Sequence, residues 1–425
     1  MTLRRNKIPE HKKEKQQSPT QAMNIQNRNQ KRSNSTKERR PVSTKKKRLI
    51  LHIGTEKTGS TSIQEFLKTN RKQLRKDGYI VPTTLGKDIH FKLQLMANSE
   101  HFVDSFWRNL GLSKNTKLRR KTIKQWRKEF EKEVKGSKGK NWIISCETLH
   151  SRLTTKEDIK RLRRILEPLF VKIDIIVYLR DPLDLVVSRL NENVKSALPI
   201  EIPLTSHKGF DICNHAETVK NWDGKLGPGE LIPRLFTTDS VLNGNVVNDF
   251  CIVCNINRST MQLPTKKNKS MPEYCLRIIN EINRYVPRRW IDGTIIKSRW
   301  ELIILIEKTL KTGEKIQANR KQIDHYKSYY EESNEWVRKK YFPQRKELFD
   351  CKQISQKSNA QVISQDQIEE IGRLIAMIWM RKNARINQLE AKTNAYKQII
   401  KKNLRGKDKF ETPRYHNKIE NFFDC

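Results

Sequence analysis

Residues 48–67 have the sequence RLILHIGTEKTGSTSIQEFL, in which an apolar run, a loop with two glycines and an amphipathic segment follow one another. The apolar run at 48–53 predicts a short buried strand. The stretch 60–74 predicts a helix, because its apolar residues recur at helical spacing. These residues are Ile63, Phe66, Leu67 and Leu74. Strand, loop and helix in this order predict the first unit of an α/β domain.

Further apolar segments at 142–145, 173–179 and 231–236 predict three more strands. The stretches 116–134 and 183–195 have helical periodicity and lie between them. Strands that alternate with helices are typical of a mostly parallel sheet that helices cover on both faces. We therefore expect an α/β fold with a central, mostly parallel sheet.

Composition divides the chain into three regions. Residues 1–47 are rich in Lys, Arg, Gln, Asn and Ser, and we expect a disordered basic tail because they cannot bury enough apolar surface to fold. Residues 48–262 contain the α/β pattern. Residues 263–425 show helical periodicity and little strand signal, which predicts an α-helical C-terminal region. Its expected helices are 272–286, 296–312, 325–341 and 366–402.

The formal net charge of +40 implies partners that carry negative charge, such as nucleotides, nucleic acid, anionic glycans or an anionic membrane surface. Seven scattered cysteines are typical of reduced thiols, and the pair Cys251 and Cys254 lies in an apolar run that predicts core packing. No N-terminal apolar region and no apolar stretch of about 20 residues is present. We therefore expect a cytoplasmic protein without a transmembrane segment.

The loop at 54–62 lies between a buried strand and a helix, which is where phosphate-binding loops occur. Its glycines allow backbone N–H groups to approach oxygen atoms, and the helix N-terminus adds positive potential. The loop differs from that of nucleoside triphosphatases, in which Lys follows the second glycine directly. Here Ser60 follows Gly59, and the lysine, Lys57, lies two residues before that glycine.

The segment LHIGTEKTGSTSIQEFL, continued by NRKQLRKDGYIVP, resembles the 5′-phosphosulfate loop of sulfotransferases that use 3′-phosphoadenosine 5′-phosphosulfate (PAPS), nearest to their prokaryotic carbohydrate-type branch. The resemblance extends unevenly over residues 48–350. It implies a core like that of P-loop NTPases and assigns to Lys57 the stabilisation of the departing phosphate. It also assigns the 5′-phosphate to the residues that follow, Thr58, Gly59, Ser60, Thr61 and Ser62.

A second motif of this family binds the 3′-phosphate through an Arg at a strand end and a Ser in the following helix. Arg180 ends the strand predicted at 173–179, and Ser188 lies eight positions later. Asp181 is expected to cap the helix and Pro182 to be its first residue. The sequence departs from the family at Arg189, where a tyrosine is frequent, and after Arg234, where Leu235 replaces a proline. Both departures concern the acceptor side.

Transfer of a sulfuryl group to a hydroxyl or amine also needs a base for the acceptor proton. Glu147 follows the predicted strand 142–145, and the resemblance to glycosaminoglycan sulfotransferases supports it as the base. The alternatives are a structural role for Glu147, paired with Lys57 or capping a helix, and His90 as the base, which follows a possible strand at 79–81. We expect His52 to be a core residue and His150 to orient Glu147.

The resemblance implies a PAPS-dependent sulfotransferase that binds PAPS and its product PAP, requires no metal, and modifies a carbohydrate or glycan. Two other classes remain open. A P-loop nucleotide kinase or NTPase is disfavoured by the position of Lys57 and by Asp174, the nearest acid, which lies inside a predicted strand. A nucleic-acid-binding protein is supported by charge alone, without a recognition motif.

Overall fold

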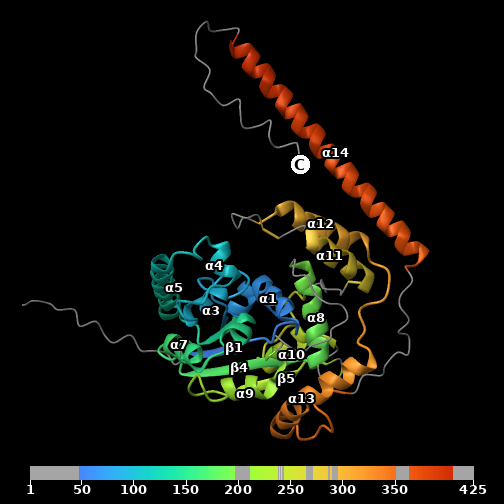
Figure 1. Ribbon diagram of the computed structural model, residues 1–425. Helices are drawn as coiled ribbons and strands as arrows, with labels where there is room; N and C mark the ends of the chain where they lie inside the picture. Colours follow the sequence, from blue (N-terminus) through green and yellow to red (C-terminus); the bar gives the residue numbers. More distant parts are fainter. Residues whose placement is uncertain are drawn as a thin grey trace, which may run out of the picture. The chain divides into compact units, whose positions relative to one another are not determined.

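The computed structural model describes residues 47–196, 211–237, 239, 241, 244–264, 271–285, 288–289, 295–350 and 363–404. Their strands form one sheet in the order β2-β3-β1-β4-β5, and every neighbouring pair is parallel (Figure 1). The strands are β1 Arg48–His52, β2 Tyr79–Ile80, β3 Asn141–Ser145, β4 Lys172–Leu179 and β5 Leu231–Leu235. This sheet confirms the predicted α/β class. The tail predicted at 1–47 lies outside the described residues except for Lys47.

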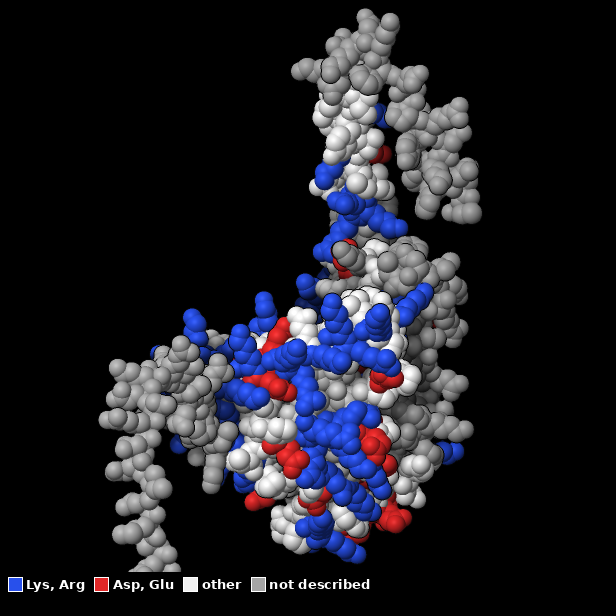
Figure 2. Space-filling model, turned by 90° about the vertical axis from the view of Figure 1, so that its left-hand side faces the viewer, with Lys and Arg blue, Asp and Glu red and all other residues white. Residues whose placement is uncertain are grey.

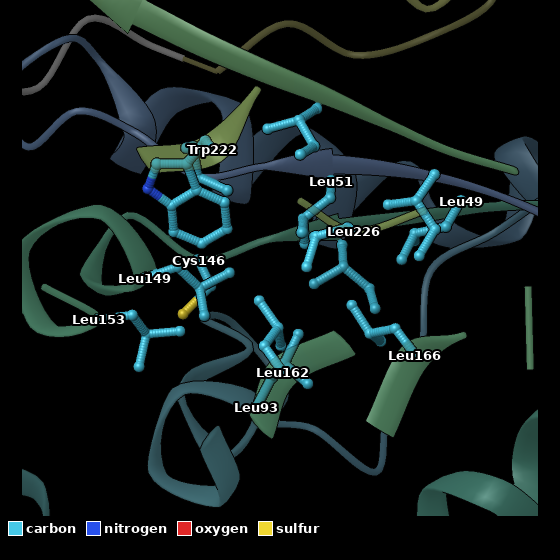
Figure 3. Close-up of a cluster of buried hydrophobic side chains, with 14 of the residues drawn as sticks. Leu49, Leu51, Leu93, Cys146, Leu149, Leu153, Leu162, Leu166, Trp222 and Leu226 are labelled. Atoms are coloured by element: carbon cyan, nitrogen blue, oxygen red, sulfur yellow. The ribbon is translucent and has the colours of Figure 1, made fainter. Parts of the chain in front are cut away.

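The strands are mostly apolar, with their polar residues mainly toward the strand ends, because both faces of the sheet are covered. Successive side chains point to opposite faces of a strand. Leu49 and Leu51 of β1 therefore enter one core, which Figure 3 shows beside Leu162 and Leu166 of a covering helix. Ile50 packs against a second core on the opposite face.

Two groups of helices cover the two faces of the sheet (Figure 1). One face carries α3 Phe91–Ala97, α4 Ser105–Asn109, α5 Thr116–Gly136, α6 Thr148–Arg152, α7 Lys156–Leu166 and α9 His215–Trp222. The other carries α1 Ser60–Thr69, α2 Arg71–Lys76 and α10 Val246–Val253. Because helices cover both faces of the sheet, the edge formed by the ends of the strands is the place left for a binding site.

The helix predicted over 60–74 is in fact two helices, α1 and α2, which meet at Asn70. The Asn70 side chain exchanges two hydrogen bonds of 2.8 Å with the backbone of Gln262. These bonds fix Asn70 to a distant segment and place the break there. The apolar periodicity predicted a single helix through Asn70 because Leu74 is buried on the same side as Phe66.

The helices after residue 270 have a core of their own. They are α11 Glu273–Tyr285, α12 Lys297–Thr309, α13 Arg320–Tyr341 and α14 Gln365–Leu404. Their apolar cluster also takes in α8 Pro182–Lys195, which comes from the α/β part of the chain. The helical character expected for this region is present in its described residues, while the domain boundary at 262/263 stays a prediction.

One side of the described surface is strongly basic. Figure 2 shows the side on which α5 and α7 lie in Figure 1, with many Lys and Arg and fewer Asp and Glu. Lysines recur along α5 three or four residues apart and are exposed, which places them on one face. They are Lys117, Lys121, Lys124, Lys128, Lys132 and Lys135. Within the described residues no helix is long and apolar enough to cross a membrane.

Candidate functional site

The strand connections change direction where β1 and β4 end, and by topology this switch point is the ligand crevice of an open α/β sheet. These strands are neighbours, yet the chain continues from β1 to β2 at one end of the sheet and from β4 to β5 at the other. The segments that follow them therefore diverge. Open α/β sheets bind their ligands at such a point, outside the carboxyl ends of the strands. The loop at 54–62 and the Arg180–Asp181 turn border this crevice.

The loop at 54–62 has a backbone that depends on its glycines. Gly59 has φ of 81°, and a Cβ at this position would lie 2.7 Å from Val246 Cγ1. Gly54 has φ of 108°, and its missing Cβ makes room for Glu147 at 3.2 Å. Lys57 also has a positive φ, 65°, which costs a non-glycine residue about 1–2 kcal/mol. Strain of this kind is frequent at functional sites.

No side chain caps the first turn of α1. Gly59 at the N-cap position has no side chain to accept a hydrogen bond, and the first turn contains no acidic residue. The hydroxyls of Thr58 and Ser60 are buried and donate to the Thr55 carbonyl at 2.6 and 3.3 Å. Thr61 is exposed and Ser62 is half-buried. The turn therefore presents positive potential, and the hydroxyls of Thr61 and Ser62, to an anion.

Arg180 joins the two sides of the crevice. Its Nη1 donates to the carbonyl oxygen of Lys57 at 2.7 Å, and its guanidinium lies 5.5 Å from the Phe236 ring. Burial lowers the pKa of Arg180 below its usual range. A guanidinium has five N–H groups, so this one bond leaves donors for a phosphate. Ser188, the predicted partner, is half-buried on α8.

The predicted start of α8 is confirmed. Asp181 is the N-cap residue, its side chain accepts from the backbone N–H of Asp184 at 3.0 Å, and Pro182 is the first helical residue. Proline suits this position because a backbone N–H at the first helical residue would have no partner within the helix, so its absence costs nothing. The capped start fixes where α8 leaves the sheet.

Two ion pairs tie the loop to α8. Lys57 Nζ lies 2.6 Å from Glu192 Oε2, so the alternative in which Lys57 pairs with Glu147 is not the arrangement observed. Arg189, the first departure from the family pattern, pairs with Glu56. Glu56 also accepts a hydrogen bond from Ser151. Sequence analysis missed both glutamates, because an ion pair across the crevice leaves no mark in either segment by itself.

Glu147 lies at the carboxyl end of β3, next to β1, and faces the loop. It occupies the N-cap position of α6 but its side chain makes no capping bond. Instead it accepts a hydrogen bond from Gln64 Nε2 of α1. Burial raises the pKa of the Glu147 carboxyl, and the charges of Glu56 and Glu192 raise it further. A carboxyl with a raised pKa is a stronger base at neutral pH.

The residue that orients Glu147 is Gln64, and not His150 as expected from the sequence. His150 Nε2 shares a hydrogen bond of 2.9 Å with the Thr218 hydroxyl, on the opposite side from α1. The sequence contained a signal for this role, because Gln64 is a polar residue on the apolar face of α1. Its side chain is only 4% exposed and lies between the buried Ile63 and Leu67.

His90 is buried and both of its ring nitrogens are engaged. Nδ1 accepts from the backbone N–H of Ser145 at 3.0 Å, and Nε2 lies 3.2 Å from the Pro82 carbonyl. Burial lowers the pKa of His90 to about 4, so the ring is neutral near pH 7. In this arrangement His90 holds the segment before α3 against the end of β3. His52, as expected, is a core residue, with Nδ1 2.8 Å from Ser145 Oγ.

Arg234, after which the sequence departs from the family, makes a structural contact. Arg234 on β5 pairs with Asp249 of α10, whose carboxylate also accepts from the Tyr178 hydroxyl at 2.7 Å. Cys251 and Cys254 are free, buried thiols of the same core, as predicted. Among the described residues no group of three or more His, Cys, Asp and Glu side chains is placed to hold a metal ion.

Known protein families and curated proteins contain no match to this chain. Among solved structures, a sulfotransferase from Alicyclobacillus acidocaldarius is similar over 60% of this chain and 95% of its own, with 14% identity and a TM-score of 0.33. The sulfotransferase domain from the curacin biosynthetic pathway is similar over 67% and 97%, with 14% identity and a TM-score of 0.27. Identities and TM-scores this low say nothing of activity, so the function proposed below rests on this chain's own residues.

Proposed function

We propose that this protein is a PAPS-dependent sulfotransferase. It transfers a sulfuryl group from PAPS to a hydroxyl or amine of an acceptor, which we propose to be a carbohydrate or glycan. One observation carries the proposal: Lys57, the uncapped first turn of α1 and Arg180 lie together at the point where the β1 and β4 connections diverge. Neighbouring positive groups on the loop and at the end of β4 suit a donor whose ribose carries both a 5′-phosphosulfate and a 3′-phosphate.

The residues around the crevice fit the two phosphate groups of the donor. The 5′ side is held by Lys57 and by residues Thr58, Gly59, Ser60, Thr61 and Ser62. The 3′-phosphate is held by Arg180, through a bidentate contact, and by Ser188. Lys57 exchanges Glu192 for the donor, because both are anionic partners of the same ammonium group. PAPS supplies the sulfuryl group and a phosphate leaving group.

In the reaction, Glu147 accepts the proton of the acceptor hydroxyl while the acceptor oxygen forms its bond to sulfur. The bond between sulfur and the bridging phosphate oxygen breaks, and Lys57 stabilises the negative charge that develops on that oxygen. Gln64 keeps the Glu147 carboxyl turned toward α1. The base is Glu147 rather than His90, whose ring nitrogens are both engaged.

Calorimetric titration with PAP, ADP and ATP–Mg²⁺ tests the donor site. We expect PAP to bind without magnesium and more tightly than ADP, since only PAP carries the 3′-phosphate. Arg180→Ala is expected to weaken PAP binding about 10- to 100-fold, as loss of a charge-assisted contact does. Arg164→Ala is the matched control, because it removes the same charge from an exposed position on α7.

Preferential binding of ATP–Mg²⁺ would overturn the proposal in favour of a nucleotide kinase. Equal loss of PAP affinity in Arg164→Ala would show that net charge, and not the crevice, attracts the nucleotide. The acceptor is then sought by transfer of labelled sulfate from PAPS to a panel of glycans. Failure with every glycan, but transfer to a simple alcohol or amine, would contradict only the carbohydrate assignment.

A further inference from the structure

The C-terminal half of α14 has an apolar stripe that nothing in the described part of the chain covers. The helix runs from Gln365 to Leu404 as one continuous element (Figure 1). Its first half is packed: Leu374 is 4% exposed, and Glu370 accepts from the Thr312 hydroxyl at 2.6 Å. By contrast, every described side chain between 381 and 400 is exposed.

Five large apolar side chains in this second half are between 47% and 66% exposed. They are Ile386, Leu389, Tyr396, Ile399 and Ile400. At about 100° per residue, four of them fall in one sector about 80° wide, and Ile399 lies about 60° beyond its edge. A helix without tertiary contacts is marginal in water, so a stripe of this kind requires a partner.

The charges beside the stripe select the partner. Residues 381–400 contain five basic side chains, Arg381, Lys382, Arg385, Lys392 and Lys397, and one acidic side chain, Glu390. Arg385 and Lys392 border one edge of the apolar sector, Lys397 borders the other, and Lys382 lies within the sector one turn before Ile386. Opposite these residues the helix is uncharged, with Asn387, Asn394 and Gln398. A second copy of α14 would place like charges together along the seam, which disfavours a homodimer.

We propose that the C-terminal half of α14 binds the surface of an anionic lipid membrane. The apolar sector enters the boundary between headgroups and acyl chains, and the flanking Arg385, Lys392 and Lys397 extend to lipid phosphates. Tyr396 suits the same boundary because its ring is apolar and its hydroxyl polar. The helix lies on the membrane and does not cross it. This proposal is independent of the proposed sulfotransferase activity.

Co-sedimentation of the full chain with lipid vesicles tests this inference. We expect binding to vesicles of phosphatidylcholine with phosphatidylserine, little binding to phosphatidylcholine alone, and weaker binding at high salt. The variant with Arg385→Gln, Lys392→Gln and Lys397→Gln should bind about 100-fold more weakly, at about fivefold for each basic residue. The variant with Ile386→Gln, Leu389→Gln and Ile400→Gln should lose at least about tenfold, because it removes the apolar contact.

The matched control is Lys121→Gln, Lys124→Gln and Lys128→Gln on α5, which removes the same charge from exposed lysines elsewhere. It should bind nearly as the unmodified chain does. Glutamine is a good helix former, so all three variants should keep the helical content and unfolding temperature of the parent, as circular dichroism will report. Binding that survives the apolar variant, or that falls equally in the control, would overturn the proposal. A dimer in sedimentation velocity that the apolar variant abolishes would assign the stripe to a second copy instead.

Discussion

Two helices begin at the carboxyl edge of the sheet, and they differ in whether acidic side chains satisfy their first backbone N–H groups. At the start of α8, Asp181 accepts a hydrogen bond from the helix and Asp184 adds a second carboxylate to the first turn. At the start of α1, Gly59 offers no side-chain cap and no acid is present. The start of α8 is capped by its own chain, while the start of α1 keeps a positive potential that the proposed donor would meet.

A third helix start at the same edge extends this comparison. Glu147 occupies the N-cap position of α6, as Asp181 does for α8, but it bonds to Gln64 instead of to its own helix. Carboxylates at equivalent positions therefore have different tasks. Asp181 stabilises its own helix, whereas the buried Glu147, whose pKa burial raises, is the base in the proposed reaction and lowers stability when it is charged.

The largest effect is expected for Glu147→Gln. Loss of a general base lowers the rate of sulfuryl transfer about 10²–10⁴-fold, while PAP binding changes little. Single-turnover transfer of labelled sulfate to the acceptor found by glycan screening measures the rate. In the unmodified chain the rate should rise with pH through the raised pKa of Glu147, and this rise should vanish in the variant. An unchanged pH profile would exclude Glu147 as the base.

The same variant should have the opposite effect on stability. Because burial raises the pKa of Glu147, the folded state holds its proton to higher pH than the unfolded chain. Its stabilising contribution is complete below the ordinary glutamate pKa and is lost as the pH rises through the raised value. Glu147→Gln should therefore unfold at higher denaturant concentration than the parent at pH 8, and the difference should shrink toward pH 4.

Lys57→Ala is expected to lower the transfer rate about 10²–10³-fold, the usual loss when one electrostatic contact to the transition state is removed. Lys68→Ala is the matched control, since Lys68 lies at the other end of α1 in an exposed pair with Asp88. The same single-turnover assay compares both. Equal rates for the two variants would contradict the role of Lys57 at the leaving group.

Thr61→Asp makes the first turn of α1 resemble that of α8. The added carboxylate faces the positive end of the helix, so we expect a gain in stability of about 0.3–1 kcal/mol. It also repels the 5′-phosphate, so PAP affinity should fall about tenfold in calorimetry. Thr61→Asn, of similar size and uncharged, should show neither effect. A fall in affinity without any gain in stability would point to local distortion rather than charge.

Asp181→Ala makes the converse change and should have the smallest effect on function. Loss of an N-cap side chain costs about 0.5–2 kcal/mol, which urea unfolding detects as a lower midpoint with an unchanged slope. PAP affinity should stay within about twofold, because Asp181 caps α8 while Arg180 is tied to the loop through the Lys57 carbonyl oxygen. A large loss of PAP affinity would show that the two helix starts are not independent.

Much of the fold was predictable because it depends on local patterns. The apolar runs at 48–53, 142–145 and 173–179 identified three central strands, and the Asp-Pro pair identified the start of α8. The break at Asn70 was not predictable, because it depends on contacts with Gln262, which is far away in the sequence. The sharing of one apolar core between α8 and the C-terminal helices was hidden for the same reason.

The sequence by itself determined which residues have the chemistry for a phosphate site, since glycines, hydroxyls and a lysine in one short loop need only local geometry. It also determined the parallel α/β class, because buried strands and amphipathic helices alternate. Only the tertiary structure decided how these residues are paired. Lys57 with Glu192, Arg189 with Glu56 and Gln64 with Glu147 come together because the order β3-β1-β4 brings three separate connections to one edge. Contacts between distant segments depend on strand order, which no single segment encodes.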